Sequence, residues 1–556
     1  MYAVAALKNT IRLGFPKKLL HNNTSRKYSN QAISHLLALS ETKLCAESPS
    51  RGLVLGVYAD EDDKTDAGQL TAAALRYNSM RTDGRLLEVL RMSGPMPKRG
   101  EARILFAVET EKVPYYSAVA VVGLGHECLG FDSFEMIDER KEAIRRGVAA
   151  ACMQLSDLST DRIEIENCGH AESAAEGAAL GVWAYQELKD AKKRMEKPSI
   201  ELYTHKDEIC DIEGWRIGLQ KAAAQNLCRE LQETPSNLLT PTAFAEKVIK
   251  VLCKTDVNVE VKGEGWAESH EMNAFLAVGK ASCEAPIFLE LSYYGGPRDD
   301  RPIVLIGQGI TYDCGGLNLK KNDELKIMRG DMAGAAVVVS TLKAISSLRL
   351  PINIRALIPL CENVMGCNSF RPGDVVKCRN GKTICIQGTD HEDVLVLADA
   401  LHYAQNFCPK CVVDIGTTSG GMRQALDESA CGVFTNSEIL WQQIKNASIH
   451  TGDRVWRFPL WNYYSRLVTK SSIASDVQNY GGGSGGNPCK AAALLREFVP
   501  CGQWMHIDAT NVMYSNGKSL EYIRKGMTGR PTRTMIEFVA QSICKETAPK
   551  IPPEKL

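Results

Sequence analysis

Short apolar runs alternate with helix-like segments along most of this chain, and no other feature restricts its fold as strongly. Residues 303–307 (IVLIG) and 411–416 (CVVDIG) have the length and the β-branched content of strands, whereas residues 333–346 have the composition of a helix. Strands that alternate with helices indicate parallel sheets covered by helices. We therefore predict an α/β fold.

The length of the chain predicts two domains. Its 556 residues exceed the roughly 250–300 at which a single core stops growing. We expect an N-terminal α/β domain over 50–200, a linker helix over 211–235 that ends at a Thr-Pro pair, a C-terminal α/β domain over 236–545 and a frayed tail over 546–556. The other expected elements are strands at 104–108, 118–125, 352–360 and 505–508, helices at 141–151 and 171–187, and a flexible glycine-rich loop at 481–486.

The first 40 residues differ in composition from the rest of the chain. They carry lysines and arginines but no acidic residue before Glu41, and Leu7, Ile11 and Phe15 recur every four residues. A basic, amphipathic segment without acids is typical of a mitochondrial transit peptide. We therefore predict a transit peptide over 1–40 and a location in the mitochondrial matrix, with a disordered basic tail as the alternative.

Charge and hydropathy argue against two classes of partner. Lys plus Arg and Asp plus Glu each number 66, so no net field attracts nucleic acid or an anionic membrane. No apolar run approaches the ~18 residues that a spanning helix needs. The 19 cysteines are scattered, and we read most of them as buried thiols of a reducing compartment.

Four carboxylates follow or adjoin predicted strand ends and glycine-rich turns, where ligands usually bind in open α/β sheets. They are Asp313, Asp331, Asp390 and Glu392. Converging carboxylates repel one another unless divalent cations neutralise them, and oxygen ligands favour Mg²⁺, Mn²⁺ or Zn²⁺. From the spacing alone, a solvated acidic surface remains the alternative to a metal site.

Several motifs resemble those of the leucyl aminopeptidase family of dinuclear metallopeptidases. The family segment NTDAEGRL is similar to residues 388–395 (GTDHEDVL), and further matches are 121–125 (VVGLG), 233–237 (ETPSN) and 526–533 (GMTGRPTR). The resemblance covers residues from about 50 to 545. It implies a peptidase-type C-terminal domain, up to two Mn²⁺ or Zn²⁺ ions, a peptide substrate, and a homohexamer, or a mixed assembly with related paralogues.

The resemblance also implies roles for individual residues. Asp313, Asp331, Asp390 and Glu392 match metal ligands, and Lys320 matches a lysine that polarises the substrate carbonyl. The pocket for an apolar N-terminal side chain matches Met328, Thr417, Gly420, Thr510 and Met513, where Thr510 replaces a usual alanine. Plain core packing is the alternative for the two methionines.

Four positions depart from the family pattern, one of them Gly388. Gln308 replaces a lysine that ligates a metal, and glutamine reaches about 1.2 Å less far where metal distances tolerate about 0.2 Å. Val394 replaces the arginine that holds a bicarbonate general base, and such a base contributes about 10²–10⁴ in rate. Asp393 stands in place of a glycine, so we expect it to disfavour a turn.

These departures predict partial metal occupancy and a weak or inactive peptidase. In this the chain resembles the sperm leucyl aminopeptidase-like proteins of insects, which implies a structural role in sperm mitochondria. Two alternatives stay open. One is a working Mn²⁺- or Zn²⁺-dependent aminopeptidase that releases N-terminal apolar residues from peptides, and the other is a module that binds peptides without cleaving them.

Overall fold

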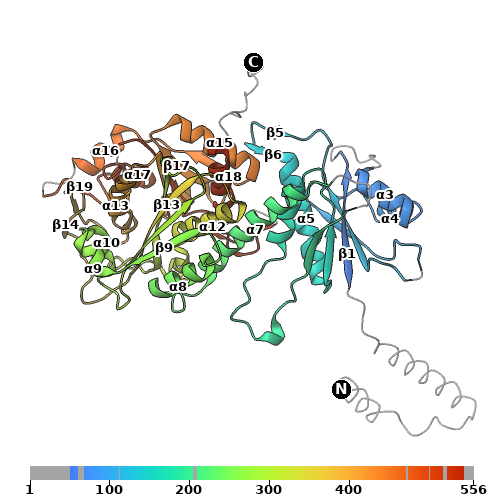
Figure 1. The fold of residues 1–556 in the computed structure, drawn as a ribbon, viewed down its shortest axis with the longest axis horizontal. Helices are drawn as coiled ribbons and strands as arrows, with labels where there is room; N and C mark the ends of the chain where they lie inside the picture. Colours follow the sequence, from blue (N-terminus) through green and yellow to red (C-terminus); the bar gives the residue numbers. More distant parts are fainter. Residues whose placement is uncertain are drawn as a thin grey trace, which may run out of the picture. The chain divides into compact units, whose positions relative to one another are not determined.

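The computed structural model describes residues 50–60, 68–111, 113–204, 210–470, 474–499, 501–517 and 522–543. The expected transit peptide and C-terminal tail lie outside these residues. Residues 51–556 form one compact unit, in which two sheets with their helices occupy different parts of the chain (Figure 1).

The N-terminal sheet has six strands in the order β3-β4-β1-β7-β8, with β2 beside β1. Its strands are β1 (Arg51–Tyr58), β2 (Gln69–Leu70), β3 (Ala102–Leu105), β4 (Ala118–Gly123), β7 (Arg162–Ile165) and β8 (Ser199–Leu202). Its other elements are α3 (Ala72–Arg81), α4 (Arg85–Met92), the hairpin β5 (Phe131–Asp132) and β6 (Ile137–Asp138), α5 (Glu139–Asp157), α6 (Ala171–Gly181) and η2 (Ala191–Lys193). Side chains of a strand alternate between faces, so Leu53 and Leu55 pack with α3 and α4 while Val54 packs with α5 and α6.

Helix α7 (Ile212–Glu233) connects the two sheets. The Asp211 side chain caps its first turn by accepting a hydrogen bond of 2.8 Å from the Gly214 amide, and it ends at Thr234, before a proline that disfavours further helix. The helix contacts α6 of the N-terminal part and α12 (Ala333–Leu348) of the C-terminal part.

The C-terminal sheet has nine strands in the order β18-β17-β20-β16-β11-β13-β10-β9, with β12 beside β13. Its strands are β9 (Val257–Lys262), β10 (Ile287–Tyr294), β11 (Ile303–Gly307), β12 (Gly309–Asp313), β13 (Asn353–Asn363), β16 (Cys411–Gly416), β17 (Cys431–Thr435), β18 (Val455–Arg457) and β20 (Gln503–Asp508). Small sheets add β14 (Val375–Lys377), β15 (Thr383–Cys385) and β19 (Val477–Gln478), and β21 (Tyr514–Ser515) with β22 (Gly526–Met527).

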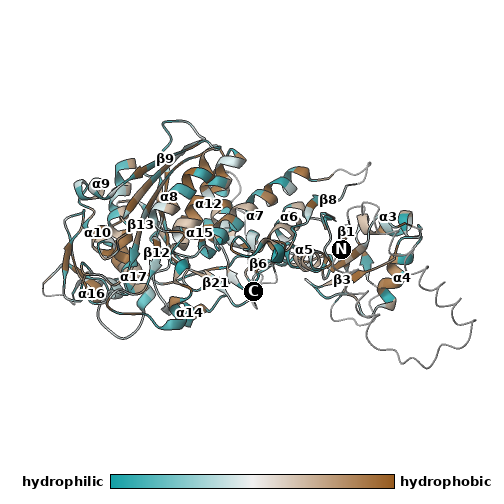
Figure 2. Cartoon of the chain, turned by 90° about the horizontal axis from the view of Figure 1, so that it is seen from below, coloured by the Kyte–Doolittle hydropathy of each residue, from teal (hydrophilic) through white to brown (hydrophobic). Residues whose placement is uncertain are grey.

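Helices cover both faces of this sheet. Ile303 and Leu305 pack against one set, and Val304 and Ile306 against the other. The first set is α7, α8 (Pro241–Leu252), α12, α15 (Glu438–Thr451) and α18 (Thr532–Ile543); the second is α9 (Glu264–Ser269), α10 (Asn273–Gly279), α13 (Asp393–Tyr403) and α17 (Asn487–Arg496). Shorter helices are α11 (Asn322–Leu325), η3 (Met328–Gly330), η4 (Ala404–Phe407), α14 (Gly421–Leu426) and α16 (Asn462–Thr469). Figure 2 shows the strands around β13 mainly in the hydrophobic colour.

The α/β fold is confirmed, but the expectation of parallel sheets is wrong in part. The central strands β13, β11, β16 and β20 are parallel, whereas β9 and β10 pair antiparallel with their neighbours. Strand β17 pairs antiparallel with β20 and parallel with β18. The helix expected over 171–187 ends at Gly181. Every cysteine in the described residues is free, and none of the described helices is long and apolar enough to span a membrane.

A buried charge network joins the two parts of the chain. Glu176 of α6 accepts hydrogen bonds from Arg145 of α5 at 2.6 Å and from Arg533 of α18 at 2.7 Å. All three side chains are almost completely buried. Breaking such a pair leaves an uncompensated buried charge, so this network fixes the N-terminal helices to the C-terminal part.

Candidate metal centre

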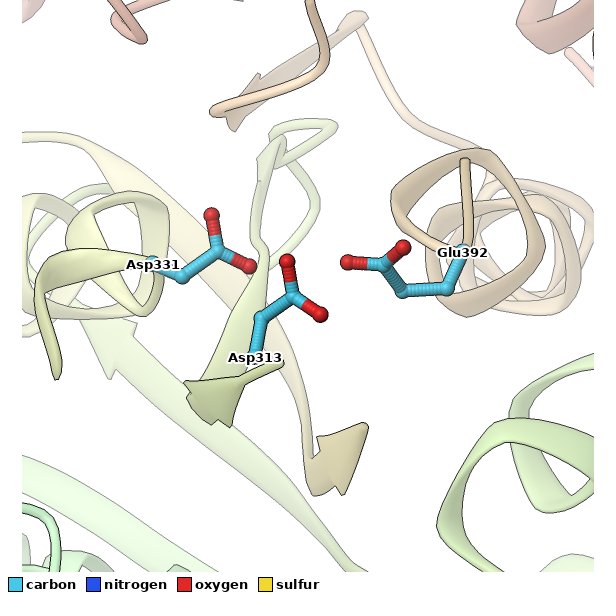
Figure 3. Close-up of side chains that lie close together, drawn as sticks. All are labelled: Asp313, Asp331 and Glu392. Atoms are coloured by element: carbon cyan, nitrogen blue, oxygen red, sulfur yellow. The ribbon is translucent and has the colours of Figure 1, made fainter. Parts of the chain in front are cut away.

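Three carboxylates from three different elements converge at one end of the C-terminal sheet. Asp313 is the last residue of β12, Asp331 directly follows η3, and Glu392 directly precedes α13. Figure 3 shows Asp331 and Glu392 facing each other on either side of Asp313. One ligand oxygen from each lies within 4.8 Å of the others, and all three residues are buried.

The electrostatics of these three carboxylates favour a positive charge close to them. Burial and the neighbouring Asp313 raise the pKa of Glu392 well above its usual value, and the same two causes raise the pKa of Asp331. The Lys320 ammonium forms an ion pair with Asp313; burial alone would lower its pKa, but Glu392 and Asp313 outweigh this and raise it. Three carboxylates and one ammonium leave two negative charges when all are ionised, which a divalent cation would neutralise.

Hydrogen bonds from neighbouring residues fix the Asp313 and Asp331 carboxylates. Oδ1 of Asp313 accepts from the Gly315 amide at 2.6 Å and from the Asn363 side chain at 2.8 Å. Oδ1 of Asp331 accepts from the Thr417 hydroxyl at 2.6 Å. Oε2 of Glu392 is buried and has no hydrogen-bond partner among the described residues. A buried, unpartnered carboxylate oxygen beside two other carboxylates fits a metal ligand.

A cavity of about 740 Å³ opens beside the carboxylates. Of the residues predicted for the site, it is lined by Lys320, Met328, Asp331, Asp390, Glu392, Thr417, Gly420, Thr510 and Met513. Asp390 therefore faces the cavity but lies outside the group of three that could share one ion. Met328 and Met513 pack against Ala333 in a small apolar cluster and also line the cavity. The two methionines therefore take part in core packing and are also placed to contact a substrate side chain.

Comparison with known proteins agrees with this geometry. The profile of the cytosol aminopeptidase family, catalytic domain, matches residues 226–536, and that of the family's N-terminal domain matches residues 54–192. This chain belongs to the cytosol aminopeptidase family. The family is metal-dependent, and the aminopeptidase resemblance and the fold expected from it are confirmed.

Individual relatives match over most of their length. The chain is 45% identical to the cytosol aminopeptidase of Sus scrofa over 89% of this chain and 93% of the relative. It is 44% identical to that of Homo sapiens over 88% of this chain and 92% of the relative. Among solved structures, the bottromycin maturation enzyme BotP in complex with Mn aligns with a TM-score of 0.74 and 26% identity, over 89% of this chain and 100% of that chain.

Gln308 is fully engaged in hydrogen bonds at the edge of this aminopeptidase-family site. Its side-chain nitrogen donates to Oδ2 of Asp331 at 3.2 Å and to the Thr417 hydroxyl at 3.0 Å, and its oxygen accepts from the Thr417 amide at 2.8 Å. The residue has no solvent exposure. The amide thus joins Asp331 to Thr417, and it presents its nitrogen, which is not a metal ligand, to the Asp331 carboxylate while its oxygen accepts from the Thr417 amide.

Val394 and Asp393 begin helix α13 next to Glu392. Val394 is 1% exposed and packs in the apolar cluster of that sheet face. Asp393 has an ordinary helical backbone rather than a positive φ, so the expectation that it disturbs a turn is wrong. The adjoining cavity measures about 10 Å³, room for about one water. Asp393 lines this small cavity, no lysine or arginine is among the described residues that line it, and Val394 brings no charge that could hold a bicarbonate.

The structure places other polar and aromatic side chains at the cavity that the sequence patterns did not indicate. His391 and Tyr480 line it with stacked rings. Thr418 also lines it and bonds to Asp508 at 2.9 Å and to His506 at 3.1 Å, deep in the sheet. His391 lies inside the recognised motif, so its position was a signal that could have found it. Tyr480 lies about 90 residues further along the chain, and no spacing links the two.

Proposed function

We propose that this protein binds a divalent cation through Asp313, Asp331 and Glu392 and is an impaired peptidase of the cytosol aminopeptidase family. The observation that carries this proposal is the hydrogen bonding of Gln308. Because its amide is committed to Asp331 and Thr417, a cation held by the three carboxylates gains no ligand from residue 308. We expect Mn²⁺ or Zn²⁺ at partial occupancy, because this position, next to Gln308, is short of a ligand.

The remaining residues support peptide binding better than peptide cleavage. A bound cation would act as a Lewis acid on the peptide carbonyl and on a water. Lys320 lies where its ammonium can orient the carbonyl oxygen, and Met328 with Met513 offers an apolar surface to the N-terminal side chain. The weak step is removal of the proton from the attacking water, since Val394 has no charge with which to hold a bicarbonate base.

Metal analysis and turnover test this proposal together. The full protein is loaded with Mn²⁺ or Zn²⁺, its metal content is measured by mass spectrometry, and hydrolysis of a leucyl-anilide is followed. We expect about one ion or less per chain and turnover at least ~10²-fold below that of a fully equipped relative. Two tightly bound ions with turnover of ~1–10³ per second would refute it.

The second candidate is a working aminopeptidase, and one observation favours it. Asp331, Glu392 and Lys320 line a cavity large enough for a peptide, and Asp313 groups with the two carboxylates, so the groups that hold the cation and the carbonyl are present. The turnover measurement separates the two candidates directly, because both predict metal binding and only this one predicts ordinary rates.

Location and assembly are further parts of the proposal. The acid-free leader supports import into mitochondria, and the resemblance to insect sperm proteins supports a structural role there. N-terminal sequencing of native protein should find a chain that begins between about residues 26 and 40.

The match to the family over both domains supports a hexamer, alone or mixed with paralogues. Light scattering that gives the 61.0 kDa of one chain would contradict it.

A further inference from the structure

One wall of the 740 Å³ cavity consists of two stacked rings. The rings of His391 and Tyr480 have centroids 4.6 Å apart and planes inclined by 24°. His391 directly precedes Glu392, so the stack begins beside the carboxylate group. Neither ring takes part in holding the cation in the proposed function.

The surrounding structure holds this stack in place. The Asn479 side chain donates to the carbonyl of Gly388 at 2.6 Å and to that of His391 at 3.2 Å, and thereby ties the segment with His391 to the one with Tyr480. Lys490, which is 2% exposed, lies 4.3 Å from the Tyr480 ring centroid and donates to the Gly483 carbonyl at 3.1 Å. A wall that is already ordered costs little conformational entropy when a ligand contacts it.

The wall and the apolar cluster belong to the same cavity. Met328 and Met513 form one part of its lining and the stacked rings of His391 and Tyr480 form another, and Asp331 and Glu392 also line it. A peptide whose first side chain contacts the methionines can therefore bring its next side chain to the ring stack within the same cavity.

We propose that the His391–Tyr480 stack is a specificity element that binds the side chain of a peptide's second residue and favours an aromatic ring there. This inference rests on the proposed use of the cavity for peptides and adds the substrate class: an apolar first residue followed by an aromatic one. Aromatic rings stack at centroid distances of 4.5–7 Å, and the two stacked rings already have that geometry. The usual strength of such a contact corresponds to a preference of about threefold to tenfold in Kd.

Binding measurements on the full Mn²⁺-loaded protein test the inference. Two tripeptides, Leu-Phe-Gly and Leu-Ala-Gly, carry a non-hydrolysable first bond, and calorimetry gives the ratio of their Kd values. His391→Ala should reduce this ratio from about threefold to tenfold to near unity while Leu-Ala-Gly binding changes little. His391→Phe should preserve the ratio because it keeps a planar ring. The matched control is Tyr463→Ala on α16, which removes an exposed aromatic ring away from the cavity.

The outcomes separate this inference from the proposed function. An unchanged ratio in His391→Ala, equal binding of both peptides to the unaltered protein, or binding of neither would overturn it. Loss of the ratio in His391→Ala with retention in His391→Phe and in the control would support it. Ordinary turnover of leucyl substrates would refute the impaired-peptidase proposal while leaving the binding ratio as it is.

Discussion

The most direct test of the metal centre is Glu392→Gln, which removes one charge and keeps the shape of the side chain. Oε2 of Glu392 has no partner among the described residues, so the substitution forfeits no hydrogen bond at that atom. Burial and Asp313 raise the pKa of Glu392, which means that its ionised form destabilises the folded protein without metal. We therefore expect opposite effects in the absence and in the presence of metal. Without a cation, the variant should be more stable than the unaltered protein; with a cation, it should lose the stabilisation that the cation gives to the unaltered protein.

The spacing of the carboxylates sets the size of the expected change in stability. Two unit charges 4.8 Å apart interact by roughly 3.5 kcal/mol at an effective dielectric constant of about 20. Glu392 faces the repulsion of Asp313 and Asp331 and the attraction of Lys320, so the net effect is about one such interaction, roughly 3 kcal/mol. A folded unit of about 500 residues loses about 1 kcal/mol of stability per degree near Tm, so the gain is about 3 °C.

Scanning calorimetry at pH 8 in EDTA and then in excess Mn²⁺ measures both effects. At about 100 times its Kd, the cation should stabilise the unaltered protein by about 2.7 kcal/mol, again about 3 °C, and the variant by much less. The folded pKa of Glu392 is raised, so its destabilisation is absent below the unfolded pKa of about 4.3 and grows as pH rises. The gain in EDTA should therefore disappear near pH 4. Glu268→Gln, at an exposed position, should change neither Tm, and a variant that responds to Mn²⁺ like the unaltered protein would refute the reasoning.

Three further predictions concern the metal centre and the buried charge network around Glu176. Gln308→Lys together with Val394→Arg should raise metal content and leucyl-anilide turnover more than either change alone, and unchanged metal content by mass spectrometry would contradict this. Added bicarbonate should change the turnover of the unaltered protein by no more than about twofold, because a base that the site positions would raise turnover by far more than that. A strong stimulation would show that the site still holds the anion. Glu176→Gln should lower Tm by about 3–5 °C, since breaking a buried pair costs about 3–5 kcal/mol, whereas Glu213→Gln in an exposed pair should lower it by less than about 1 °C.

The sequence predicted the central strands well because their apolar runs are buried on both faces. The run at 411–416 is identical in extent to β16, and 303–307 to β11. Such strands consist almost entirely of apolar residues. The outer strand β9 alternates polar and apolar residues in a short segment, and its antiparallel pairing with β10 depends on tertiary contacts that no local pattern contains.

The metal ligands of the site could be predicted from the sequence, but the hydrogen bonds and ring contacts around them could not. Asp313, Asp331 and Glu392 could be named because each stands in a recognisable motif. The motif could not show that the Gln308 amide turns toward Thr417, since that bond joins residues 109 positions apart. The stack of His391 on Tyr480 likewise depends on how two loops meet.

The carboxylate group bears on a structural role as well as on catalysis. Without a cation, three buried carboxylates with one ammonium destabilise the fold. With a cation, they cross-link β12, the end of η3 and the start of α13, which are far apart in the sequence. Because metal bound only to the folded state adds its binding free energy to stability, a protein that no longer cleaves peptides would still gain from keeping these ligands. Retention of the carboxylates is therefore compatible with an impaired peptidase, and turnover after Gln308→Lys together with Val394→Arg distinguishes the two roles.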